Sequence, residues 1–132
     1  MPGFRSTAQW QRIRMAILRR DSFTCQICGD MLRSGRADRS GTVLRPAVVD
    51  HIAPYDWAGV PSDAATAHGN LWSVCSGCDG QVVRSIEDAH RARKDWQAVR
   101  RDKLAVRVIG FDGRTQGPQV RPIDNMRYPD GQ

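Results

Sequence analysis

The amino-acid sequence predicts a small α+β domain, and three features carry this prediction. A segment near the N-terminus repeats its apolar residues with the period of a helix, a short β-branched segment ends at a proline, and two Cys-x-x-Cys pairs lie far apart in the chain. The length of 132 residues is typical of one domain. We expect residues 1–113 to form this domain and residues 114–132, which include three prolines, to form an extended or flexible C-terminal tail.

The first predicted element is an amphipathic helix over residues 7–20. Ser6 and Gln9 have the spacing of a capping box, and apolar residues follow at helical intervals from Trp10 to Leu18. The opposite face carries arginines, so the helix is expected to pack on the domain through one apolar stripe. The polar face supplies two candidate nucleic-acid contacts, Arg12 and Arg19, for which a solvated surface is the alternative interpretation.

The remaining elements are expected to be short. The polar, Gly- and Arg-rich residues 33–45 indicate a loop, and residues 47–54 (AVVDHIAP) indicate a strand that enters a turn. A second loop is expected over residues 55–69. After the second cysteine pair, residues 80–101 show an irregular helical face, and residues 105–111 alternate enough to predict a strand.

The charge of the chain favours a polyanionic partner. Twenty basic residues against fourteen acidic ones give a net charge of +6 and a pI near 9.8, and only two of the basic residues, Lys94 and Lys103, are lysines. The planar guanidinium of arginine suits bidentate phosphate contacts, and Arg84 is a third candidate nucleic-acid contact. A G+C-rich genome would also explain the arginine bias. No apolar run has the length of a membrane span, and the first ten residues lack the apolar stretch of a secretory signal, so we expect a cytoplasmic protein with no membrane partner.

The four cysteines form two matched pairs, which are Cys25 with Cys28 and Cys75 with Cys78. Gly29 follows the first pair and permits the tight turn that directs both sulfurs toward one ion. Two such pairs in a reducing compartment are typical of a tetrahedral, four-thiolate structural Zn²⁺ site. Thioredoxin-like redox chemistry is the competing interpretation, but it uses one reactive pair and leaves the second pair unexplained.

The combined order of these motifs resembles a known family. The run CQICG … VVDHIAP … NLWSVCSGCDG is similar to the small phage-type HNH (His-Asn-His) endonucleases that carry a four-cysteine zinc site, and the resemblance covers roughly residues 10–113. It implies a small ββα-metal (His-Me finger) fold with flanking helices. It also implies that a histidine and a divalent ion lie on either side of one scissile phosphate.

Carried over residue by residue, the resemblance assigns His51 as the general base, because a neutral imidazole accepts a proton from water near neutral pH. Asp50 would coordinate the catalytic divalent ion, Mg²⁺ or Mn²⁺, which neutralises the phosphate and stabilises the departing 3′ oxygen. The implied products carry 5′-phosphate and 3′-hydroxyl ends. Asn70 matches the central asparagine of the motif, where it either ties the intervening loop together through hydrogen bonds or assists the metal.

One position departs from the pattern of the family. Asp79 stands where the last histidine of the motif is most often found, directly after the second cysteine pair. Aspartate is a good ligand for a hard cation, so the resemblance still implies that Asp79 binds the catalytic metal. Decay to a protein that binds DNA without cutting it is the alternative. A helix N-cap is the local structural role that Asp79 could also have.

These observations lead to two main functional hypotheses. The first is a metal-dependent DNA endonuclease or nicking enzyme that acts on double-stranded DNA as a monomer or weak dimer. Such an enzyme is expected to be phage-encoded, to work in the cytoplasm of a bacterial host, and to have phage packaging proteins as candidate partners. The second is a non-catalytic, zinc-stabilised nucleic-acid-binding protein, which would show salt-dependent binding and no magnesium-dependent product.

Overall fold

The computed structural model of the chain describes residues 7–35 and 44–107. The predicted tail over residues 114–132 lies outside the described residues, as does most of the strand predicted over residues 105–111. The loop predicted over residues 33–45 is described only at its two ends.

The first helix, α2 (Ala8–Arg20), confirms the helix predicted near the N-terminus. Its N-cap is Thr7, whose Oγ1 accepts a hydrogen bond from the backbone N–H of Trp10 at 3.1 Å. The cap is therefore Thr7 and not Ser6, because the Thr7 hydroxyl satisfies an amide of the first turn that has no partner within the helix.

Three strands form one small sheet in the order β1-β2-β3. Their bounds are Leu32–Arg33 for β1, Arg45–His51 for β2 and Leu71–Cys75 for β3. β1 pairs in parallel with β2, and β2 pairs antiparallel with β3, with His51 opposite Leu71 at one end and Ala47 opposite Cys75 at the other. β2 confirms the strand predicted over residues 47–54, although it begins earlier and ends at His51. The loop between β2 and β3 closes with a 3₁₀ turn, η1 (His68–Asn70).

The chain after β3 is helical, but it is not the single helix predicted over residues 80–101. A helical run comprises α3 (Ser76–Cys78), a π-helical turn η2 (Asp79–Val83) and α4 (Arg84–His90), and a separate helix α5 spans Trp96–Val106. The break comes where Lys94 adopts a left-handed backbone with φ of 51°. Asp95 then caps α5 by accepting a hydrogen bond from the N–H of Ala98 at 3.1 Å.

The strand predicted over residues 105–111 is wrong where the structure describes it, because α5 continues through Val106. The buried residues of this region recur at helical intervals, but three of them are basic, so the sequence shows no continuous apolar stripe there. The buried positions are Trp96, Ala98, Val99, Arg100, Lys103, Leu104 and Arg107.

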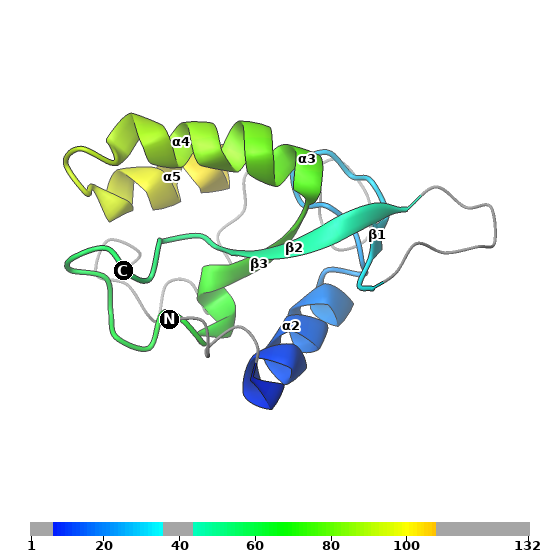
Figure 1. Cartoon of the computed structure of the whole chain (residues 1–132). Coiled ribbons are helices and arrows are strands. Elements are labelled where there is room, and N and C mark those ends of the chain that lie inside the picture. Colours follow the sequence, from blue (N-terminus) through cyan, green and yellow to red (C-terminus); the bar gives the residue numbers. More distant parts are fainter. Residues whose placement is uncertain (1–6, 36–43, 108–132) are drawn as a thin grey trace.

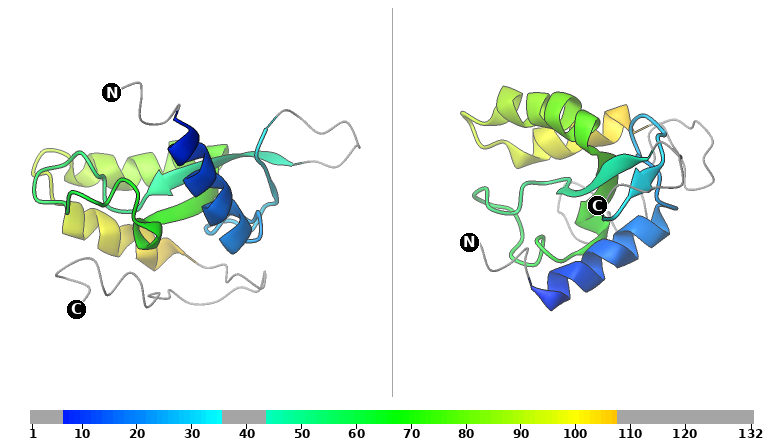
Figure 2. Two further views of the ribbon diagram at one scale, coloured as in Figure 1. Left: turned by 90° about the horizontal axis from the view of Figure 1, so that it is seen from below. Right: turned by 45° about the vertical axis from the view of Figure 1, so that its right-hand side comes forward.

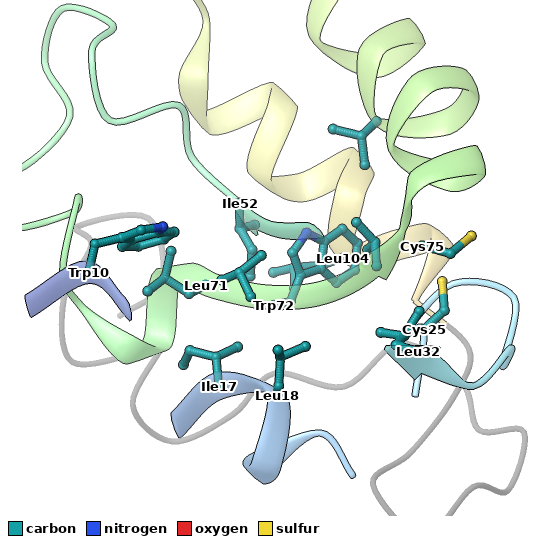
Figure 3. Packing of buried hydrophobic residues seen from close by; sticks show 13 residues of the cluster. Trp10, Ile17, Leu18, Cys25, Leu32, Ile52, Leu71, Trp72, Cys75 and Leu104 are labelled. Atoms are coloured by element: carbon teal, nitrogen blue, oxygen red, sulfur yellow. The ribbon is translucent and has the colours of Figure 1, made fainter. Parts of the chain in front are cut away.

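The sheet lies between α2 on one side and the pair α4 and α5 on the other (Figure 1, Figure 2). The main apolar cluster fills the space between these layers. Ile17 and Leu18 of α2 meet Leu71 and Trp72 of β3, and all four side chains are almost completely buried (Figure 3). The sulfur atoms of the cysteine pairs lie at one edge of the same cluster. The apolar packing that stabilises the sheet therefore also fixes the positions of Cys25 and Cys75.

Candidate active site and metal centre

The four cysteines converge on one point, although 46 residues separate Cys28 from Cys75 in the sequence. Their four Sγ atoms all lie within 4.8 Å of one another, and the Cys28 and Cys75 sulfurs are 3.8 Å apart. Four sulfurs bound tetrahedrally to Zn²⁺ at about 2.3 Å have edges of about 3.8 Å. The predicted cluster is confirmed as a group that fits one metal ion such as zinc.

Both cysteine pairs adopt the same local geometry. The N–H of Cys28 donates to Cys25 Sγ at 3.5 Å, and the N–H of Cys78 donates to Cys75 Sγ at 3.3 Å. Gly29 has a φ of 85°, a left-handed backbone that favours glycine, as the sequence predicts. These amide donors stabilise negative charge on sulfur, which a metal-bound thiolate requires.

Burial opposes the ionisation of two of the four thiols, Cys28 and Cys78. Burial, with the neighbouring Cys25 thiol, raises the pKa of Cys28 to about 12, and burial also raises the pKa of Cys78. Burial disfavours the Cys75 thiolate too, but the hydrogen bonds from Cys78, Cys28 and Cys25 outweigh it and the pKa of Cys75 is lowered. A divalent ion is therefore needed to keep all four sulfurs ionised near neutral pH.

A pocket of about 310 Å³ opens beside the end of β2, on the face covered by η2 and α4. Among its lining residues are three that the sequence predicts for the catalytic site, namely Asp50, His51 and Asp79. Four more charged residues also line it, which are Asp56, Arg84, Glu87 and Arg91. The pocket joins residues from β2 with residues from the helical run after β3, which the antiparallel pairing of β2 and β3 brings together.

His51 lies at the last position of β2 and is held on three sides. Its ring stacks on Trp10 with centroids 5.7 Å apart and leans against Tyr55 with centroids 4.6 Å apart. Its Nε2 lies 3.1 Å from the carbonyl oxygen of Ala65. A carbonyl only accepts, so this contact assigns the proton to Nε2, and the neutral ring then has its lone pair on Nδ1. His51 is only 3% exposed, yet it lines the pocket.

Asn70 is fully buried and bonds the backbone of the loop between β2 and β3. Its Oδ1 accepts from the N–H of Ala53 at 2.7 Å, and its Nδ2 donates to the carbonyl oxygens of Ala53 at 2.9 Å and Ala64 at 3.2 Å. The next residue, Ala65, is the one whose carbonyl oxygen contacts the His51 ring. Of the two roles that the motif allows, these contacts match the one in which Asn70 ties the loop together.

Asp50 is fixed by two donors that bind the same oxygen. Trp72 Nε1 and Lys103 Nζ each lie 2.9 Å from Asp50 Oδ2. Lys103 also donates to the carbonyl oxygen of His51 at 2.7 Å and to Glu87 Oε2 at 2.8 Å, while its own side chain is completely buried. A buried ammonium with three acceptors is fully satisfied, since it has three N–H groups.

Asp79 lies in the π-helical turn η2 and faces other carboxylates. Burial raises its pKa, and the negative charges of Asp50 and Glu87 raise it further. Lys103 and Arg84 oppose this shift. Asp50, Asp79 and Glu87 all line the pocket. Within the described part of the chain, however, only the four cysteines form a group of three or more potential ligands close enough to hold one ion.

The three arginines predicted to contact nucleic acid fall in two places. Arg12 and Arg19 are exposed on α2, on the far side of the sheet from α4 (Figure 1). Arg84 is exposed and lines the pocket. Sequence reasoning did not single out Arg91, which also lines the pocket and lies 5.7 Å above the ring of Trp57.

Sequence reasoning also missed Lys103 and Glu87. The signal for Lys103 was its position seven residues after Trp96 and four after Val99, where an amphipathic helix buries its residues. A cation there is normally taken for a surface residue. Glu87 gave no signal, because a carboxylate in a charged helix is unremarkable until α4 is placed beside α5.

Comparisons of the chain with protein-family models, with curated proteins and with solved structures find no match. In the described residues, no helix combines the length and the apolar character that crossing a membrane requires.

Proposed function

We propose that this chain is a metal-dependent endonuclease that hydrolyses phosphodiester bonds in DNA, with His51 as general base and with Asp50 and Asp79 at one Mg²⁺ or Mn²⁺ ion. The supporting observation is that these three residues line one pocket next to the four-cysteine cluster. The structure is α+β, with two antiparallel strands followed by a helix around the pocket. A ββα-metal fold of the HNH type, implied by the sequence resemblance, is part of this proposal.

In the proposed mechanism, His51 accepts the proton of the attacking water through Nδ1. The Ala65 carbonyl fixes the tautomer by accepting from Nε2, and Trp10 and Tyr55 restrict the rotation of the ring. General-base catalysis requires this defined geometry and a pKa near the operating pH, which an imidazole supplies.

The carboxylates of Asp50 and Asp79 supply oxygen ligands, which hard divalent cations prefer. When bound, the cation neutralises charge on the phosphate and stabilises the departing oxygen. Asp79 requires the cation more than an ordinary aspartate does, because its charge is disfavoured by burial and by its acidic neighbours. This gives a physical reason why aspartate in place of the last motif histidine is compatible with Mg²⁺.

The cysteine cluster has a structural role in the proposal. A four-thiolate zinc site has no open position for water and cannot itself catalyse hydrolysis. Cys75 ends β3, and Cys78 immediately precedes Asp79. Zinc bound there would fix the start of the helical run, and with it the position of Asp79 relative to β2.

The test is cleavage of supercoiled plasmid by the zinc-loaded chain, with and without Mg²⁺ or Mn²⁺. We expect cation-dependent nicking or linearisation, and we expect His51→Ala to lower the rate by about 100-fold or more, the usual contribution of a general base. His90→Ala is the matched control, because His90 pairs with Asp102 and does not line the pocket. Equal cleavage by wild type and His51→Ala would refute the role of His51.

A second candidate is a zinc-stabilised protein that binds nucleic acid without cutting it. Its supporting observation is that Lys103 already supplies Asp50 with a positively charged partner at 2.9 Å, so the charge of this carboxylate is paired without a cation. This candidate predicts salt-dependent DNA binding and no product with any divalent ion. The same plasmid experiment, with binding measured in parallel, therefore distinguishes the two functions.

A further inference from the structure

The inference concerns Lys103, the buried lysine of α5. A lysine ammonium is rarely buried because its desolvation is costly. Here the Lys103 side chain has no exposed surface, and its Nζ has acceptors on two different elements, which are Asp50 and the His51 carbonyl on β2 and Glu87 on α4. Apolar residues would fill this volume at lower cost, so the stability of the fold does not by itself explain the lysine.

The contacts of Lys103 are with the two adjacent residues that the proposed reaction uses. It binds the side chain of Asp50 and the backbone carbonyl of His51 at 2.9 Å and 2.7 Å. Successive residues of a strand direct their side chains to opposite faces, so one ammonium that holds both residues fixes the relation between the carboxylate and the imidazole.

The Asp50 carboxylate is held asymmetrically. Lys103 and Trp72 both donate to Oδ2, and no hydrogen bond to Oδ1 is found among the described residues. The side chain of Asp50 is 13% exposed and lines the pocket. Two donors on one oxygen fix the plane of the carboxylate and leave Oδ1 without a donor among the described residues. Hydrogen-bonded partners behind a metal ligand commonly orient it and so increase the affinity for the metal.

We propose that Lys103 is a positioning residue, which together with Trp72 orients Asp50 for the divalent cation. This inference rests on the proposed nuclease function, since it concerns the metal site of that reaction. Lys103 contacts neither DNA nor the cation, and it acts through Asp50. Its ammonium also pairs with Glu87, so it joins a carboxylate of β2 to a carboxylate of α4 beside the pocket.

The experiment measures Mn²⁺ binding to the zinc-loaded chain without DNA, by the loss of the electron paramagnetic resonance signal of free Mn²⁺. Lys103→Met keeps the volume of the side chain and removes the three donors. We expect the Mn²⁺ dissociation constant to rise about 10- to 100-fold, the usual effect of losing such a partner. Plasmid cleavage at saturating Mn²⁺ should fall as well, since Asp50 is no longer oriented.

Two controls separate positioning from stability. Lys94→Met is the same substitution at the only other lysine, which is exposed, and it should leave Mn²⁺ binding unchanged. Leu32→Ala removes core packing at β1, which contributes no residue to the lining of the pocket, so it should lower the melting temperature without changing Mn²⁺ binding. A lysine with a purely structural role would behave like Leu32 in this comparison.

If Lys103→Met does not fold, Trp72→Phe decides the test. It removes the other donor to Asp50 Oδ2 while keeping the ammonium, and weaker Mn²⁺ binding is the expected result. Unchanged Mn²⁺ affinity in the folded variant overturns the positioning role, while the nuclease proposal survives if wild type still cleaves. A wild-type chain that neither binds Mn²⁺ nor cleaves DNA overturns both proposals.

Discussion

Asn70 and Ala53 are joined by two hydrogen bonds that run in opposite directions. The N–H of Ala53 donates to Asn70 Oδ1 at 2.7 Å, and Asn70 Nδ2 donates to the Ala53 carbonyl at 2.9 Å. The amide side chain thus pairs with the backbone as a neighbouring strand would. The same Nδ2 also donates to the carbonyl oxygen of Ala64, so one buried side chain closes this loop. The carbonyl oxygen of the next residue, Ala65, contacts the His51 ring.

Asn70→Ala should therefore lower the free energy of unfolding by about 3 kcal/mol, since it leaves buried backbone groups of Ala53 and Ala64 without their partner. Urea unfolding monitored by tryptophan fluorescence measures this change. We also expect lower cleavage activity in whatever folded fraction remains, because the carbonyl that orients His51 loses its support.

Ser73→Ala is the matched control for that measurement. Ser73 is also fully buried, but its Oγ has no hydrogen-bond partner among the described residues. Removing a buried hydroxyl that makes no hydrogen bond should change the free energy of unfolding by less than about 1 kcal/mol, or raise it. A large loss in Ser73→Ala, equal to that in Asn70→Ala, would contradict this account of the two sites.

The cysteine cluster predicts one tightly bound Zn²⁺ per chain. Removal of the ion by a strong chelator should lower the melting temperature by about 10 °C or more, because the free energy of binding contributes directly to folding. Elemental analysis gives the stoichiometry, and calorimetry gives the melting temperature. Cys28→Ser should reproduce most of the loss. A melting temperature that chelation does not change would show that the sulfurs hold no structural ion.

If the chain binds DNA as proposed, its arginines predict which face of the domain contacts the DNA. Arg84 lines the pocket, whereas Arg12 and Arg19 lie across the sheet from it. If the pocket receives the scissile phosphate, Arg84→Ala should reduce the slope of log K against log salt by about 0.9, the loss of one phosphate contact. Fluorescence anisotropy with duplex DNA in Ca²⁺ measures binding without cleavage.

Arg93→Ala supplies the control for Arg84, because Arg93 is exposed near the end of the same helical region and does not line the pocket. If the pocket alone receives the phosphate, Arg12→Ala and Arg19→Ala should also leave the slope unchanged, and the sequence-based prediction that these two arginines contact nucleic acid would then be wrong. A reduced slope only in these two α2 variants would move the DNA-binding face to the other side of the sheet.

The raised pKa of Asp79 predicts a pH-dependent stability difference. An acid whose pKa is raised by folding binds its proton more tightly in the folded state, so wild type loses stability as pH rises from about 3.8 through the folded pKa. Asp79→Asn has no proton to lose. It should therefore match wild type in acid and exceed it at neutral pH, as measured by thermal unfolding across this range.

Mg²⁺ should reverse the comparison if Asp79 is a ligand. The cation stabilises the ionised carboxylate of wild type, so adding Mg²⁺ at neutral pH should raise the melting temperature of wild type and have less effect on Asp79→Asn. Equal responses of the two melting temperatures to Mg²⁺ would show that Asp79 is not a ligand of the cation.

Several elements of the structure follow directly from local sequence patterns. The helix α2 was predictable because its apolar residues keep one period, and the zinc-type cluster because two Cys-x-x-Cys pairs have few other uses in one chain. The boundary between α4 and α5 was not predictable, since it depends on a left-handed backbone at Lys94, which is not a residue that favours that conformation. The end of α5 was wrongly predicted to be a strand because Arg100, Lys103 and Arg107 are buried cations. Their charges hide the helical period of the buried positions in the sequence.

The sequence by itself determined the chemical inventory of this protein: four cysteines for a metal, an Asp-His pair at the end of a strand, and a following asparagine. Only the tertiary structure decided which groups meet. Local patterns report the periodicity of one segment, whereas the burial of Lys103 against Asp50 and Glu87 depends on the packing of α5, β2 and α4, which lie far apart in the chain. A buried charge without a partner is costly, so the ammonium of Lys103 must meet its carboxylates in the folded protein. This cost arises only once the three elements have assembled.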